Sequence, residues 1–346
     1  MKAAVQGRYG PPEVVRITEV PTPVPTENQL LVKVHATTVN RTDGHIRSGR
    51  PLVMRLLYGL TKPRVTILGN EFAGEVAAVG DAVAAFNVGD RVFGYCEGPF
   101  GAHAEYLVVP ADGCVATIPR GLSYEEAAPG TEGSHYALSM LAKAAVHEGQ
   151  DVLVYGATGA IGSAAVQLLK SMGVTVTAVC ATAHVDLVRG LGADRVVDYT
   201  ADDFTKDPQR FDLILDAWGE LSYFRCTHLF KPSGIYMSTG PGPGWVNAVL
   251  PLATPLLRRN RVVFGLPKID QSTVCYLAGL LESGQFRPVI DRHIPLDQIA
   301  DAYRYVEAGQ KVGNVVINVT TSSSSAGLRP SPGAGRHCAE TESPAA

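Results

Sequence analysis

A short apolar run that breaks into closely spaced glycines and continues as an amphipathic helix is the most restrictive feature of this chain. It covers residues 152–170 and reads VLVYGATGAIGSAAVQLLK. Gly159 would let a backbone approach phosphate oxygens, and Gly162 would let the helix lie close to its strand. The free N–H groups at the start of a helix attract anions. The segment therefore predicts a strand, a tight turn and a helix whose start holds a pyrophosphate.

One glycine-rich turn is not specific by itself, because ordinary strand–helix turns also contain glycine. Here Ala157 stands where the first glycine of the common G-x-G-x-x-G fingerprint would be, and an additional Gly156 precedes it. Further apolar runs occupy 174–180, 195–197, 211–216, 234–238 and 261–264, with helical patterns such as 185–191 between several of them. Strands that alternate with helices pair in parallel through right-handed crossovers. Six strands and this turn predict a doubly wound α/β sheet that binds a nucleotide.

Length and composition place the chain among globular proteins with more than one domain. It has 346 residues, of which 46% are hydrophobic and 18% charged, and its net charge is −3. This weak charge without a basic cluster gives no reason to expect a nucleic acid partner. The polar N-terminus lacks the apolar core of a signal peptide, and no apolar stretch is long enough to span a membrane. Six widely separated cysteines indicate neither a disulfide framework nor a clustered zinc site, which predicts a cytoplasmic protein.

Residue patterning divides the chain into domains. Residues 1–125 are rich in glycine, proline and β-branched residues and predict an all-β lobe, with strands at 29–36 and 71–79. The parallel sheet fills 126–266. Helices and strands then follow at 272–282, 289–294, 296–308 and 315–319. From residue 320 to 346, serine, glycine, proline and alanine dominate and cannot bury enough apolar area for order, which predicts a disordered tail.

Five segments together resemble the medium-chain dehydrogenase/reductase superfamily, and within it the zinc-independent quinone oxidoreductase group. They are residues 39–49, 68–80, 88–94, 152–170 and 191–199. The resemblance implies a GroES-like catalytic domain built from 1–125 and 267–319, and a Rossmann cofactor-binding domain over 126–266. It also implies a cleft where a nicotinamide meets the substrate, and a homodimer joined along the last Rossmann strand, 261–264.

The resemblance also bears on whether a metal takes part. Zinc-dependent relatives place a cysteine where Asn40 stands and a histidine where Asn70 stands, and their four-cysteine structural zinc loop is missing here. An amide oxygen is a poor zinc ligand, and Glu71 with His45 would leave the site underfilled. A site without metal is therefore implied. Thr42 and His45 match the proton relay of zinc alcohol dehydrogenases, but a turn-shaping role for Thr42 and a surface role for His45 stay open.

Without a metal, orientation and hydrogen bonding must carry the chemistry. Hydride would pass from the nicotinamide to an electron-poor carbon while a donor stabilises charge on the substrate oxygen. The first candidate for that donor, or for holding the nicotinamide ribose, is Asn40. Quinones and α,β-unsaturated carbonyls suit such a site because delocalisation spreads the developing charge. An NADP-dependent alcohol dehydrogenase and a non-catalytic NADPH-binding protein are the alternatives.

Two further features each have two interpretations. The apolar insertion Pro51–Pro63 is either a wall over the substrate or a helix packed into the core of its own lobe. His135 lies in a segment where the family often has a Gly-Leu-Thr-Ala turn. It is either a proton donor or a packed helix histidine.

The end of the second strand of the parallel sheet bears on the choice of nucleotide. NAD sites usually place a carboxylate there, whereas this chain has none until Asp186. Loss of that carboxylate removes repulsion toward a 2′-phosphate, which predicts NADPH. Thr182 and His184 are candidate donors to that phosphate, the resemblance adds Tyr199, and Arg189 is either a further ligand or a solvated helix residue. The remaining predicted cofactor contacts, several carried over from the family, are Asn40, Thr131, Gly156, Thr158, Gly159, Ala160, Ile161, Gly162, Thr239, Gly240, Leu266 and Asn314.

Overall fold

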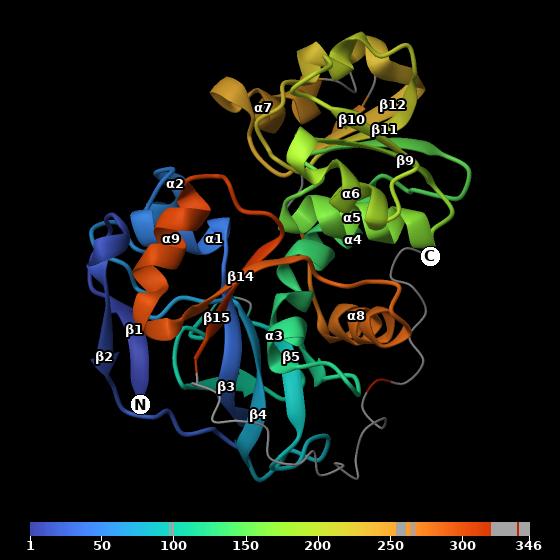
Figure 1. Cartoon of the computed structure of the whole chain (residues 1–346). Coiled ribbons are helices and arrows are strands. Elements are labelled where there is room, and N and C mark those ends of the chain that lie inside the picture. The colour runs from blue at the N-terminus through green and yellow to red at the C-terminus, as the bar shows by residue number, and fades with distance from the viewer. Residues whose placement is uncertain (97, 99, 254–260, 264–266, 320–337, 339–346) are drawn as a thin grey trace. The chain divides into compact units, whose positions relative to one another are not determined.

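The computed structural model of this chain describes residues 1–96, 98, 100–253, 261–263, 267–319 and 338. The chain forms two compact units (Figure 1). The first unit consists of Met1–Glu132 together with the segment that begins at Ile269, and the second consists of Gly133–Lys268. The second unit is thus inserted, in sequence, between the two parts of the first.

Six parallel strands form the sheet of the second unit, counted over the described residues. Their spatial order is β10-β9-β8-β11-β12-β13. The strands are β8 (Asp151–Tyr155), β9 (Thr175–Cys180), β10 (Arg195–Asp198), β11 (Phe211–Asp216), β12 (Phe230–Ser238) and β13 (Arg261–Val263). Helices α5 (Ala160–Ser171), α6 (Val185–Gly190) and α7 (Val246–Ala253) follow β8, β9 and β12, and α4 (Glu132–Lys143) precedes the sheet. The middle residues of the two central strands, 152–154 of β8 and 213–215 of β11, are apolar and buried because both faces of a doubly wound sheet are covered. The predicted α/β fold class is confirmed.

The first unit is built around an antiparallel sheet that the end of the chain completes. The strand order is β14-β15-β3-β4-β5-β7, with β6 paired to β3, and β1 and β2 form a separate pair. The strands are β1 (Lys2–Gln6), β2 (Val15–Glu19), β3 (Gln29–Val39), β4 (Glu71–Val79), β5 (Arg91–Tyr95), β6 (Tyr106–Pro110), β7 (Val115–Thr117), β14 (Ile290–Pro295) and β15 (Asn314–Asn318). Strand β15 pairs with β3 so that Val315 lies opposite Val39. The C-terminal segment thus returns into the sheet of the first unit.

The prediction that the first 125 residues are all-β is wrong. This part contains helices α1 (Arg41–Ser48), α2 (Val53–Tyr58) and α3 (Tyr124–Ala127). Helix α1 begins with a capping box in which the Asn40 side chain accepts from the Asp43 backbone and the Asp43 side chain accepts from the Asn40 backbone. It ends at Gly49, whose φ of 62° favours glycine. The N-x-x-D pattern of residues 40–43 indicates a helix start, but the all-β prediction rested on the glycine, proline and β-branched composition of the region.

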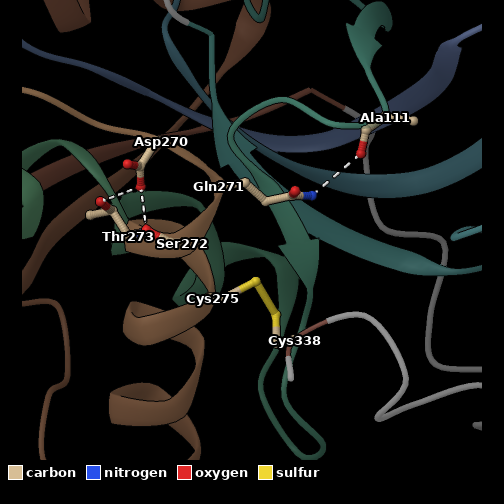
Figure 2. The surroundings of a disulfide bond; sticks show 7 residues. All are labelled: Ala111, Asp270, Gln271, Ser272, Thr273, Cys275 and Cys338. Atoms are coloured by element: carbon tan, nitrogen blue, oxygen red, sulfur yellow. Dashed lines mark hydrogen bonds between the residues drawn. A yellow bond between two sulfur atoms is a disulfide. The ribbon is translucent and has the colours of Figure 1, made fainter. Parts of the chain in front are cut away.

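The first unit also holds helices α8 (Gln271–Ser283) and α9 (Ile299–Glu307). Asp270 caps α8 by accepting from the Thr273 backbone at 2.8 Å, and a disulfide joins Cys275 of this helix to Cys338 (Figure 2). The cysteine spacing did not predict this bond, since 63 residues separate the two sulfurs in sequence. Apart from Cys338, the predicted disordered tail, 320–346, lies outside the described residues.

Over the described ranges, none of the helices is long and apolar enough to cross a membrane. Helix α8 has 13 residues, which at about 1.5 Å per residue is shorter than a hydrocarbon core of about 30 Å.

Candidate active site

Two asparagines form the centre of a buried polar cluster in the first unit. Asn40, the N-cap of α1, donates from Nδ2 to Asn70 Oδ1 at 2.7 Å, and its own Oδ1 accepts from the Asp43 backbone at 3.0 Å. Asp43 also accepts from the Gly69 backbone at 3.0 Å, which ties the start of α1 to the residue before Asn70. An asparagine side chain binds a metal ion through its amide oxygen. Here the amide oxygens of both Asn40 and Asn70 already accept hydrogen bonds.

Glu71, the first residue of β4, organises the donors below this asparagine pair. Its carboxylate accepts from Thr38 Oγ1 at 2.5 Å, from Thr131 N at 3.1 Å and Oγ1 at 3.0 Å, and from Glu132 N at 2.6 Å. Burial raises the pKa of Glu71, and these donors lower it part of the way back. Four donors to one carboxylate fix the start of α4 against β4.

Glu132 connects the asparagine pair to α1. Its Oε1 accepts from Thr42 Oγ1 at 2.9 Å and its Oε2 accepts from Asn70 Nδ2 at 2.9 Å, while Asn70 also donates to Tyr95 OH at 3.1 Å. Burial, followed by the charge of Glu71, raises the pKa of Glu132 to about 8. The sequence analysis missed Glu132, because its partners lie 90 and 62 residues away along the chain.

Lys311 supplies a positive charge to the same part of the first unit. It precedes β15 and donates to the Gly313 carbonyl. Burial lowers its pKa to about 8, a shift that the charge of Arg41 increases and that Glu71 and Glu132 partly offset. The cluster therefore combines two buried carboxyl groups and one cation whose protonation states depend on one another.

The described residues contain no group of three or more His, Cys, Asp or Glu side chains that could hold a metal ion. At the two positions where zinc-dependent relatives have ligands, Asn40 and Asn70 bond each other through their amides. His45 lies on α1 with an exposed side chain. These residues do not fit the donor set that zinc prefers.

The glycine turn of the second unit has the geometry that the sequence indicated. Gly156 follows β8 with a φ of 78°, which favours glycine. A Cβ on Gly162 would lie 2.2 Å from the Gly156 carbonyl oxygen, so α5 requires a glycine there to lie close to its strand. A Cβ on Gly159 would meet only that same oxygen at 3.7 Å. Gly159 is the N-cap of α5 and offers no capping side chain to the N–H groups of the first turn.

The predicted nucleotide contacts of the second unit gather at one edge of its sheet. Thr158 belongs to the turn after β8, and Ala160 and Ile161 open α5. Thr182 and His184 follow β9, Tyr199 follows β10, and Thr239 and Gly240 follow β12. Because all these strands are parallel, their carboxyl ends share one edge, where open α/β sheets bind ligands. Leu266 lies outside the described residues.

An acidic side chain also lies at this edge, which the sequence analysis did not foresee. Strand pairing sets Asp198 opposite Cys180, the last residue of β9. Asp198 accepts from Thr182 Oγ1 at 2.5 Å and from Thr200 Oγ1 at 2.7 Å. These hydroxyl donors lower the pKa of Asp198, so it is ionised at neutral pH. Asp198 of β10 thus places a carboxylate beside the end of β9, where the chain itself has no acidic residue until Asp186.

The same edge carries a hollow of about 290 Å³. Its lining includes Tyr155, Tyr199, Phe204 and Arg225, together with the carboxylates of Asp202 and Asp203. Aromatic rings and a guanidinium suit a base and a phosphate, respectively. Arg189, by contrast, pairs with Asp186 at 2.9 Å on the exposed face of α6.

Other sequence candidates lie elsewhere. Thr131 is buried with both its backbone N–H and its hydroxyl on Glu71, and Asn314 donates to the Val289 carbonyl at 3.0 Å. His135 is buried in α4 with its ring beside Tyr136. In the insertion Pro51–Pro63, helix α2 packs Met54 and Tyr58 against a core cluster. The insertion leaves five large apolar side chains exposed: Leu52, Val53, Leu56, Leu57 and Leu60.

A Rossmann sheet with a glycine turn, in one chain with an antiparallel unit that carries a buried polar cluster, defines a class of pyridine-nucleotide-dependent oxidoreductases. Residues 26–120 match the family described as "Alcohol dehydrogenase GroES-like domain", and residues 191–317 match that described as "Zinc-binding dehydrogenase". The chain belongs to the medium-chain dehydrogenase/reductase superfamily and is quinone oxidoreductase-like.

Relatives and solved structures agree with this membership. A 2-methylene-furan-3-one reductase of Solanum lycopersicum is 32% identical over 92% of this chain and 79% of its own length. An NADPH-dependent alkenal/one oxidoreductase of Arabidopsis thaliana is 29% identical with the same coverage of both chains. The structure of the quinone oxidoreductase from Coxiella burnetii superposes with a TM-score of 0.82 at 28% identity, over 92% of this chain and 99% of that one. The predicted family and enzyme class are confirmed.

Proposed function

We propose that this enzyme reduces quinones or α,β-unsaturated carbonyl compounds with NADPH and without a catalytic metal. The observation that carries the proposal is the Asn40–Asn70 amide pair, which occupies the two metal-ligand positions of the zinc-dependent relatives. The names of the tomato, Arabidopsis and Coxiella relatives give the substrate classes. When bound, NADPH supplies the hydride.

The residues of the first unit then orient the substrate and stabilise charge on its oxygen. The Asn40 amide nitrogen carries two protons, and one of them points at Asn70. We assign the second to the substrate oxygen or the nicotinamide ribose. The half-buried Thr42 hydroxyl is the second polar group of α1 assigned to the substrate. The glycine turn from Gly156 to Gly162 would hold the pyrophosphate.

Turnover without metal is the first testable consequence. With NADPH and either an enone or a naphthoquinone, we expect steady oxidation of NADPH, followed at 340 nm, and we expect EDTA to leave the rate unchanged. Loss of activity with EDTA and its return with zinc would contradict the metal-free site. Oxidation of simple alcohols with NADP⁺ would instead support the alcohol dehydrogenase alternative. Stabilisation by NADPH without turnover across the acceptor panel would support a non-catalytic protein.

The nucleotide preference gives a second test, centred on Asp198. Thr182, Tyr199 and Arg225 support binding of a 2′-phosphate, whereas the ionised Asp198 opposes it. Asp198→Asn removes this charge and keeps an acceptor for Thr182. We expect the ratio of kcat/KM for NADPH to that for NADH to rise on the order of fivefold, about 1 kcal/mol for one solvated charge. Asp81→Asn, at an exposed aspartate of the first unit, is the matched control. An unchanged ratio in D198N, or a wild type that prefers NADH, would refute this assignment.

A homodimer and a cytoplasmic location complete the proposal. Among the described strands, β13 is the last in the order of the parallel sheet, a position from which a second copy would extend the sheet. Light scattering of the purified protein measures the assembly. For a cytoplasmic location we expect Cys275 and Cys338 to be free thiols in protein taken from cells under rapid acid quench, and an intact Cys275–Cys338 disulfide in that thiol titration would contradict the location.

A further inference from the structure

Glu132 is a buried acid with a hydrogen-bonded connection to a less buried hydroxyl. Its side chain is 6% exposed, and its Oε1 lies 2.9 Å from Thr42 Oγ1 on α1. The other oxygen, Oε2, is held by Asn70 Nδ2. When the carboxyl group is ionised, Thr42 donates to it. When it is protonated, the same contact can run in the opposite direction, which leaves the Thr42 proton free for another acceptor.

The surroundings favour the protonated form of Glu132. The carboxyl groups of Glu71 on β4 and Asp43 on α1 face it, and both oppose a further negative charge. Tyr95 on β5 donates to it, and Lys311, which precedes β15, carries the opposing positive charge. Burial and the two carboxyl groups raise the pKa of Glu132 to about 8, and the donors Thr42 and Tyr95 offset this shift only in part, so Glu132 holds a proton at neutral pH.

We propose that Glu132 stores the proton for the reduction and passes it to the substrate oxygen through the hydroxyl group of Thr42. This inference rests on the proposed reductase function and adds a proton path to it. Thr42 is the residue that would touch the substrate. Glu132 does not touch the substrate. It supplies a proton to the Thr42 hydroxyl and is therefore a positioning residue.

With an enone as the substrate, the hydride that NADPH would supply forms a C–H bond at the β-carbon, and the π electrons move to the carbonyl oxygen as an enolate. The Thr42 O–H bond breaks and its proton joins the enolate oxygen. The Glu132 O–H bond breaks in turn, and its proton restores the Thr42 hydroxyl. Glu132 is left as a carboxylate that takes a proton from solvent before the next turnover, and the released enol tautomerises to the saturated ketone.

Thr42 variants test the path with little risk to the fold. Thr42→Val removes the hydroxyl while keeping the shape, and Thr42→Ser restores it. We expect kcat with an enone and NADPH to fall on the order of 100-fold in T42V, with KM for NADPH little changed, and to recover most of that loss in T42S.

Wild-type kcat should fall as pH rises above about 8, where Glu132 loses its proton. Glu132→Gln should lower kcat similarly and abolish this alkaline fall. The double variant T42V/E132Q should be no slower than either single variant.

A second readout does not depend on turnover. Because the folded-state pKa of Glu132 lies above its unfolded value, the folded protein binds more protons, and the free energy of unfolding should fall as pH rises from about 4.5 through about 8. E132Q should lose most of the part of this fall above about pH 6, because Asp216, whose pKa burial raises to about 6, contributes its own fall below that pH. Glu282→Gln, an exposed control on α8, should keep the whole fall.

Full kcat in T42V, or an alkaline fall that persists in E132Q, would overturn the proton path while leaving the reductase intact. If the wild type oxidises no NADPH with any enone or quinone, the proposed function itself fails. In that case the pH dependence of unfolding would still measure the pKa of Glu132. The proposed proton path would then be refuted together with the reductase function.

Discussion

Gly159→Asp is expected to weaken NADPH binding by at least 100-fold without destabilising the fold. Gly159 is the N-cap of α5 with a φ of −73°, which any residue adopts, and a Cβ there meets nothing closer than 3.7 Å. Aspartate is among the preferred N-cap residues, so the free energy of unfolding should be unchanged or slightly higher. Its charge, however, would face the pyrophosphate at a separation where repulsion is about 4 kcal/mol near a protein surface. Calorimetric titration with NADPH measures the loss.

Two companion variants separate charge from shape. Gly159→Ser is also a good N-cap but neutral, and it should lose far less affinity than G159D. Gly162→Ala should instead reduce stability, because its Cβ would stand 2.2 Å from the Gly156 oxygen. If G159D binds NADPH as tightly as the wild type, this turn does not hold the pyrophosphate.

Glu71→Ala is expected to lower the free energy of unfolding by about 3–5 kcal/mol. The substitution leaves four buried donors without their acceptor: Thr38 Oγ1, Thr131 N, Thr131 Oγ1 and Glu132 N. An orphaned buried donor costs about 1–3 kcal/mol, and partial relaxation reduces the sum. Urea unfolding measures the change. Activity should fall as well, because Glu71 positions the backbone of Glu132.

Glu75→Ala is the matched control, since Glu75 lies on the same strand with an exposed side chain. It should change stability by no more than about 0.5 kcal/mol. A loss below 1 kcal/mol in E71A would show that these donors find other acceptors, and that Glu71 does not organise the cluster.

The local pattern of apolar residues and glycines was sufficient to predict the strands of the parallel sheet in the second unit. The strand predicted at 211–216 is observed as Phe211–Asp216, and the helix predicted at 185–191 as Val185–Gly190. Apolar runs and glycine spacing act over a few residues, so they can be read without tertiary information. Helix α1 was missed although its capping box, Asn40 with Asp43, is equally local. That signal was present in the sequence and was not used.

Partners distant in sequence could not be found in the same way. Asp198 stands beside Thr182 because β10 pairs with β9 in one register, and a register is set by the packing of the whole sheet. Likewise, Glu132 contacts Thr42 across 90 residues, and Cys275 bonds Cys338 across 63. No spacing rule connects residues so far apart.

The sequence by itself determined the parallel sheet, the glycine turn and the loss of ligand-type residues at positions 40 and 70. Each of these depends on residue identity and near neighbours. Only the tertiary structure decided that Glu132 joins the asparagine pair and that Asp198 faces Thr182. The protonation state of a carboxyl group and the charge that a ligand meets depend on burial and on neighbours brought together by folding.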